Sequence, residues 1–161
     1  MNHQELFVKM ALSAWESHNE RVNKLLEQLS DAQLHLETAA GRNTGIYLLG
    51  HLTAVNDALL PLLGFGERMF PELDVAFIKN PDKSNQPMPS LPILKECWKK
   101  VNAELTDRMK DLSADDWFTR HNAVSEEDFI KEPHRNKLNI ILNRTNHQSY
   151  HLGQLMYLVK K

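Results

Sequence analysis

The sequence predicts an all-α protein, a four-helix bundle with long connections between the helices. Four stretches repeat apolar residues at the spacing of one face of an α-helix, and no convincing strand pattern occurs in the 161 residues. Each helix then has one apolar face to bury, and four such faces pack together as a bundle. Two connections are long, so the helices need not follow a simple up-down-up-down order. We expect a single domain covering residues 1–161.

The first predicted helix covers residues 3–29, without an internal glycine or proline. Its apolar positions recur at helical spacing: Phe7, Met10, Ala11, Ala14, Trp15, Val22, Leu25, Leu26 and Leu29. The residues that follow, Ser30-Asp31-Ala32-Gln33, have the spacing of a capping box and predict a short extra helical turn.

The second predicted helix, residues 44–63, is rich in aliphatic side chains. Thr44 can cap its first turn, and Pro61 predicts an irregular last turn because proline has no backbone N–H to donate. At about 100° per residue, the aliphatic side chains cover an arc from about 20° to 180° measured from His51. His51 therefore lies at the edge of the buried face, where it can point into the bundle and still be reached from solvent.

The connection over residues 64–90 is rich in residues that break helices: Gly66, Pro71, Pro81, Pro87 and Pro89. It shows no sustained period, so we expect it to be irregular. A connection of this length is either a plain crossover or a lid over a functional site, and the two readings are equally favoured. The third predicted helix covers residues 91–112 and accepts Pro92 in its first turn.

Residues 113–133 are again predicted to be irregular, apart from a short helix that starts at Ser125. The fourth predicted helix covers residues 134–159. Measured from His147, its apolar arc runs from about 20° to 140°, with His151 inside the arc and His147 on its rim. The second and fourth helices therefore carry their histidines in the same relation to their buried faces.

These histidines are candidate metal ligands. His147 and His151 lie one turn apart on one helix face, close enough for both imidazoles to bind one divalent metal ion. Such a pair is weak alone, since eight histidines produce roughly 0.4 such pairs by chance. His51 is the candidate third ligand. Gln148 stands where the peptidase motif H-E-x-x-H has its glutamate, which argues against a peptidase of that type. The alternative is two satisfied core-edge histidines and an unrelated third, with no shared metal.

Two segments of the chain resemble a known family. Residues 45–52 end an aliphatic run in Gly50-His51-Leu52, and residues 147–154 follow the pattern H-x-x-x-H-x-G-Q. The combination resembles the DinB-like (DNA-damage-inducible) metalloprotein family over most of the chain. One departure is Asn143, where relatives often carry a histidine or an acidic residue.

The resemblance implies that His51, His147 and His151 bind a divalent metal inside a four-helix bundle. It also implies one of several activities, because the superfamily includes transferases and isomerases that use bacillithiol or mycothiol, together with many members of no assigned activity. Some members form homodimers, and we expect a homodimer here.

Three imidazoles with a vacant position are typical of catalytic zinc sites, and imidazole suits nickel as well as zinc. A water molecule activated at the vacant position would make the protein a hydrolase, and a thiol would make it a transferase. Arg144, Tyr47 and Gln154 are candidate substrate-binding residues, although each is also explained as a polar residue at the rim of the bundle. Asp57 falls outside the apolar arc, so neither ligand-bearing helix is expected to supply a general base.

Composition limits the other possibilities. The net charge is −2 and no segment carries a basic stripe, so we do not expect nucleic acid as a partner. Cys97 is the one cysteine, expected as a buried core thiol, so no internal disulfide can form and a reducing cytoplasm is favoured. We expect no uninterrupted apolar run of membrane-spanning length and therefore no membrane association.

The leading hypothesis is a cytoplasmic enzyme that uses a divalent metal, zinc or nickel, to act on a small molecule with a bacillithiol-type thiol or with water. The alternative is a metal-binding or stress-response helical bundle without catalysis, acting through dimerisation.

Overall fold

The computed structural model describes residues 2–159, and within this range the regular secondary structure is helical, apart from two isolated bridges, Glu37 with Thr44 and Arg120 with Asn136. The predicted all-α class is confirmed. In chain order the elements are α1 (His3–Gln28), α2 (Asp31–Leu34), α3 (Gly45–Asp57), α4 (Leu59–Leu63), α5 (Leu73–Phe77), α6 (Leu91–Lys110), α7 (Ala114–Trp117), α8 (Glu126–Lys131), α9 (Lys137–Leu155) and the 3-10 turn η1 (Met156–Leu158).

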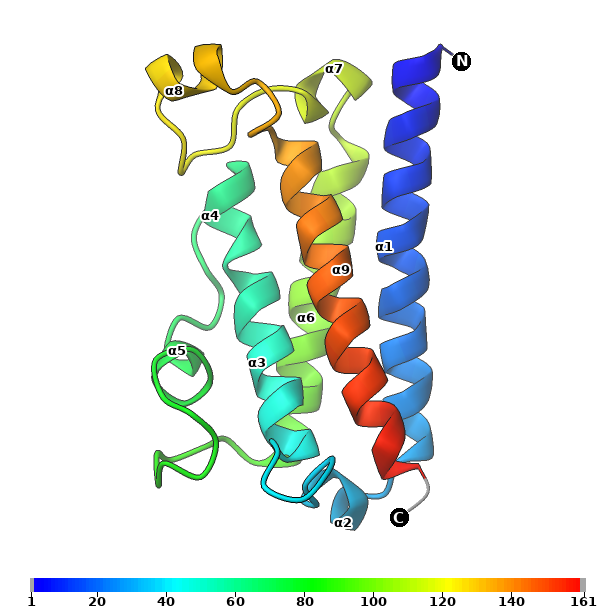
Figure 1. Ribbon diagram of the computed structural model, residues 1–161, viewed down its shortest axis with the longest axis vertical. Helices are drawn as coiled ribbons and strands as arrows, with labels where there is room; N and C mark the ends of the chain where they lie inside the picture. The colour runs from blue at the N-terminus through cyan, green and yellow to red at the C-terminus, as the bar shows by residue number, and fades with distance from the viewer. Residues whose placement is uncertain (1, 160–161) are drawn as a thin grey trace.

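The long helices α1, α3, α6 and α9 lie side by side as a bundle (Figure 1). α9 packs against both α1 and α3, and α3 packs in turn against α6. α3 and α9 run in opposite directions in Figure 1, so the end of one helix lies beside the start of the other. The core between the helices contains three tryptophans that are almost fully buried, Trp15, Trp98 and Trp117. The bundle thus supplies a rigid frame for side chains that α3 and α9 present to each other.

Side-chain caps explain where several helices begin. Ser30 forms a capping box with Gln33 at α2, and the Thr44 hydroxyl accepts from the Tyr47 N–H at α3, as the sequence indicated. Ser125 caps α8. The fourth predicted helix was placed three residues too early: α9 starts at Lys137 because the Asn136 side chain accepts from the Asn139 N–H.

The predicted irregularity near Pro61 is confirmed. α3 ends at Asp57 and α4 begins at Leu59, so the helix is interrupted between them. Proline at position 61 has no N–H to donate to the Asp57 carbonyl, which breaks the hydrogen-bond ladder at that point.

Residues 45–63 pass the length and composition test for a membrane span, contrary to the expectation from the sequence, with a mean hydropathy of 1.4. However, 78% of the 18-residue window tested is buried inside the protein. Leu48, Leu49, Leu52 and Leu59 are fully enclosed by the other helices. The apolar character of this segment is therefore accounted for by its place at the centre of the bundle.

The segment over residues 64–90 leaves α4, returns along the outside of α3 and ends at α6 (Figure 1). It was predicted to be irregular, but it contains one short helix, α5, which packs on α3. Phe77, the last residue of α5, is fully buried. We call residues 64–90 the strap, because both of its ends are fastened to α3 by contacts described below.

Candidate metal centre

The three candidate ligands come together between α3 and α9. The Nε2 atom of His147 lies 3.2 Å from Nε2 of His51 and 3.1 Å from Nε2 of His151. One nitrogen from each ring lies within 4.8 Å of the others. His51 and His147 are half-buried and His151 is 9% exposed, so the cluster sits at the edge of the core as the helical wheels predicted.

The spacing of the three nitrogens fits a metal ion. Imidazole nitrogens bound at 2.0–2.1 Å in tetrahedral geometry lie about 3.3 Å apart, close to the two distances between the rings here. Three imidazoles would occupy three positions of such an ion and leave a fourth for a ligand. These residues could therefore hold a divalent metal of the catalytic type.

The protons in the cluster point to the same conclusion. His51 Nδ1 lies 2.8 Å from the Phe77 carbonyl oxygen, which can only accept, so Nδ1 carries the proton and Nε2 presents a lone pair. His151 Nδ1 likewise donates to Gln154 Oε1, at 2.7 Å. His147 Nε2 faces both lone pairs and has at most one proton to share between them. Its own Nδ1 is buried and has no hydrogen-bond partner among residues 2–159. A cation at the meeting point of the three rings would satisfy all three nitrogens.

Burial and neighbouring positive charge favour the neutral imidazole, which is the form that binds metals. Burial lowers the pKa of His147 to about 4, assisted by the nearby rings of His151 and His51 and by the positive charge of Arg144. Burial also lowers the pKa of His151. A metal-binding imidazole must be neutral, and both rings are neutral at pH 7 without any metal.

The strap fixes the orientation of His51. Its Phe77 carbonyl receives the His51 Nδ1 proton, and the Phe77 ring lies directly on Gly50. A Cβ atom at position 50 would overlap the ring, so only glycine allows the strap to lie this close to α3. Tyr47, one turn earlier, stacks on His51 with an angle of 6° between the rings. Contacts of this kind hold a ligand ring in place.

Asp57 fastens the first end of the strap. Its carboxylate accepts from the backbone N–H groups of Met69 and Phe70 and from Arg68 Nε. The sequence placed Asp57 outside the buried arc of α3, but its side chain is fully buried because the strap covers that side of the helix. Both Asp57 oxygens bond to residues 68–70 of the strap. Asp57 therefore points away from the histidines, as the sequence predicted.

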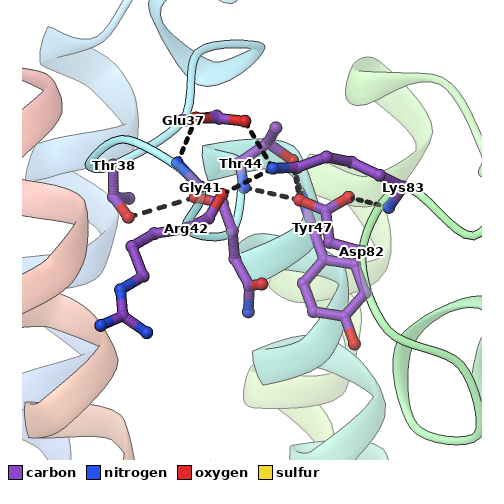
Figure 2. Close-up of polar contacts among 9 residues, drawn as sticks. Glu37, Thr38, Gly41, Arg42, Thr44, Tyr47, Asp82 and Lys83 are labelled. Atoms are coloured by element: carbon purple, nitrogen blue, oxygen red, sulfur yellow. Dashed lines mark hydrogen bonds and ion pairs between the residues drawn. The ribbon is translucent and has the colours of Figure 1, made fainter.

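Asp82 fastens the second end, at the start of α3 (Figure 2). One of its oxygens accepts from both the backbone N–H and the hydroxyl of Thr44. Beside it, Lys83 forms an ion pair with Glu37, and the Tyr47 hydroxyl donates to the Asn80 carbonyl. The carbonyl that orients His51 thus lies between two fastened ends of one segment.

The candidate substrate-binding residues lie in three different settings. Gln154 accepts a hydrogen bond from His151 Nδ1, the ring nitrogen that faces away from the other two histidines. Tyr47 directs its hydroxyl to the strap, so its ring forms a wall beside His51. Arg144 lies on α9 one turn before His147, is half-buried, and has no hydrogen bond or ion pair within residues 2–159. Their roles in substrate binding stay predictions.

Sequence reasoning missed the residues that position the site. Phe77 acts through its backbone carbonyl, which no side-chain pattern reveals. Gly50 and Asp57 could have been found from the sequence. A glycine or an acidic residue within a mostly apolar helix usually has a packing role.

The match to known proteins agrees with this geometry. The sequence profile of the DinB superfamily matches residues 14–155. The chain belongs to the DinB superfamily. A crystal structure described as a conserved protein of locus from Enterococcus faecalis has the same fold, with a TM-score of 0.66, 12% identity and 94% of each chain covered. No curated protein matches the chain.

Proposed function

We propose that this DinB superfamily protein is an enzyme that uses a divalent metal, zinc or nickel, held by His51, His147 and His151. The proposal rests on the Nε2 atoms of His51, His147 and His151, which converge on one point with at most one proton between them. Nitrogen lone pairs that face one point are costly without a cation between them.

A divalent metal bound there supplies a Lewis acid that activates a thiol or a water molecule at its open position. The residues of the chain prepare that position. The Phe77 carbonyl and the Gln154 side chain hold two rings in the tautomer that presents Nε2. The low pKa of His147 keeps its ring neutral near pH 7. Partial exposure of His51 and His147 leaves a route for a small molecule.

Between the two reaction types, the surroundings favour a thiol transferase over a hydrolase. No carboxylate forms a hydrogen bond with the three histidines within residues 2–159, so a base to deprotonate water is missing from the immediate surroundings. A thiol has a pKa near 8.5 and ionises without such a base when it meets a cation. We therefore favour transfer of a bacillithiol-type thiol to an electrophilic small molecule.

Turnover assays can test this choice. The metal-loaded protein is mixed with an electrophilic substrate, with and without bacillithiol, and loss of the thiol is followed. We expect turnover that requires both the thiol and the metal, and its loss in His51→Ala. His35→Ala serves as the control, since His35 is exposed and its Nδ1 bonds to the Asp31 carbonyl. Turnover with water alone would make the protein a hydrolase.

We also propose that the protein works as a homodimer in the cytoplasm. Phe7 and Met10 support the dimer, because both are about half exposed, at 47% and 60%, and lie one turn apart on α1. Light scattering after gel filtration should show twice the mass of 18.6 kDa. A monomeric mass at micromolar concentration would refute this part.

A further inference from the structure

Arg144 carries a charge that no group among residues 2–159 pairs. Its Nε atom is fully buried without a hydrogen-bond partner, and none of its nitrogens bonds to another group within residues 2–159. The contrast with Arg68, also half-buried, is informative. Arg68 bonds through three nitrogens, to Asp57, Asp74 and the Ala54 carbonyl. The chain therefore does satisfy a half-buried guanidinium elsewhere.

An unpaired guanidinium in this position is costly. Arginine stays charged in proteins, and a buried charge is normally paired or hydrogen-bonded. Burial lowers the pKa of Arg144, which reflects the cost of keeping the charge there. Within residues 2–159 no acidic side chain offsets it. An anion from outside the chain would.

The location places such an anion next to the three imidazoles. At about 100° per residue, Arg144 lies about 60° around α9 from His147 and about 20° from His151, roughly one turn along the axis from His147 and two turns from His151. Its positive charge lowers the pKa of His147, so the two groups are electrostatically close. A metal at the histidines would add further positive charge on the same side. A small molecule reaching both groups would carry its negative charge at one end and its reacting group at the other.

We propose that Arg144 binds a carboxylate of the substrate or of its thiol partner beside the metal position. The guanidinium presents its N–H groups as a planar fork that matches the two oxygens of a carboxylate. In the metal-free protein one guanidinium balances one negative charge, which favours a carboxylate over a doubly charged phosphate. The inference deepens the proposed function and rests on it for the neighbouring metal. The binding of the anion itself can be measured without the metal.

The test is a titration of the metal-free protein with sodium acetate, at constant ionic strength, followed by the nitrogen-15 NMR signal of the Arg144 side chain. We expect a saturable shift of that signal. In Arg144→Met, read from neighbouring backbone amides, acetate affinity should fall at least tenfold. In Arg144→Lys it should fall less, since the charge stays and the fork is lost. Arg21→Met removes an equal charge from an exposed position on α1 and should leave acetate binding unchanged.

Thermal stability separates this role from a structural one. Without anions, Arg144→Met removes an uncompensated charge and keeps the apolar stem, so the melting temperature should rise by about 2–4 °C. A lower melting temperature together with unchanged acetate binding would overturn the proposal, and so would phosphate binding more tightly than acetate at pH 7. If the metal binds and Arg144→Met does not affect acetate, only this inference fails. If acetate binds through Arg144 and the metal does not bind, only the proposed function fails.

Discussion

Two helical glycines in this chain should respond in opposite ways to the same substitution. Replacing glycine by alanine inside a helix normally stabilises a protein by roughly 0.5–1 kcal/mol, because the unfolded chain loses freedom. Gly153 on α9 follows this rule, since a Cβ there meets nothing within 4 Å. Gly50 on α3 does not, because its Cβ would overlap the ring of Phe77.

The magnitude at Gly50 follows from the packing. Phe77 is fully buried and cannot swing away, so the added methyl forces the strap outward at a cost of about 1–3 kcal/mol. After the helix-propensity gain, Gly50→Ala should lose about 1–2 kcal/mol, while Gly153→Ala gains up to about 1 kcal/mol. Outward movement of the strap also stretches the bond between the Phe77 carbonyl and His51, so metal affinity should fall about 10–100-fold in Gly50→Ala alone.

Urea unfolding of the metal-free proteins and a competition titration with a chelating zinc indicator measure both effects. Phe77→Leu in the Gly50→Ala background should recover part of the affinity, because the ring is removed and the backbone carbonyl remains. Equal stabilisation by both alanine substitutions would refute the close contact between the strap and α3. Loss of stability with unchanged zinc affinity would show that the Phe77 carbonyl does not matter for the ligand.

Further predictions concern the strap and the ionisation of the site. Asp57→Asn should destabilise the protein by about 2–4 kcal/mol and speed amide hydrogen exchange at Met69 and Phe70, since a buried charge is lost and an NH2 donor replaces one of its two acceptor oxygens. Unchanged exchange at these amides would contradict the anchor. The pKa of His147 is about 4 when folded and near 6.5 when unfolded, so the unfolded state binds more protons between these values and metal-free stability should fall as pH drops from 6.5 to 4. Solvent screening of a half-buried ring limits this loss to roughly 1–2 kcal/mol. His147→Ala should flatten the dependence in urea unfolding at pH 5 and 7. Because the pKa of His147 is about 4, bound metal should be retained at pH 6 and released as the pH falls below about 4, and retention well below pH 4 would contradict imidazole ligands.

The sequence predicted the parts of this fold that depend on periodicity and on local capping. Apolar spacing located the long helices, and Thr44 and Pro61 marked a start and an interruption within the second one. The same periodicity placed His51 and His147 at the rims of their helices, where the structure brings them together.

Contacts between distant segments could not be predicted in this way. A helical wheel gives the direction of Asp57 but not what covers it, and the strap that buries it lacks a periodic pattern. Likewise, the partner of His51 Nδ1 is a backbone carbonyl 26 residues away, which depends on how the strap returns along α3.

The central claim is that His51, His147 and His151 bind one metal ion together. Titration of the purified metal-free protein with zinc or nickel, followed by calorimetry and elemental analysis, tests it most directly. We predict one equivalent bound to the wild-type protein and to His35→Ala, and at least a hundredfold loss of affinity in both His51→Ala and His147→Ala. Full binding in His51→Ala would show that the helix α3 ligand is not part of the site and would contradict the account.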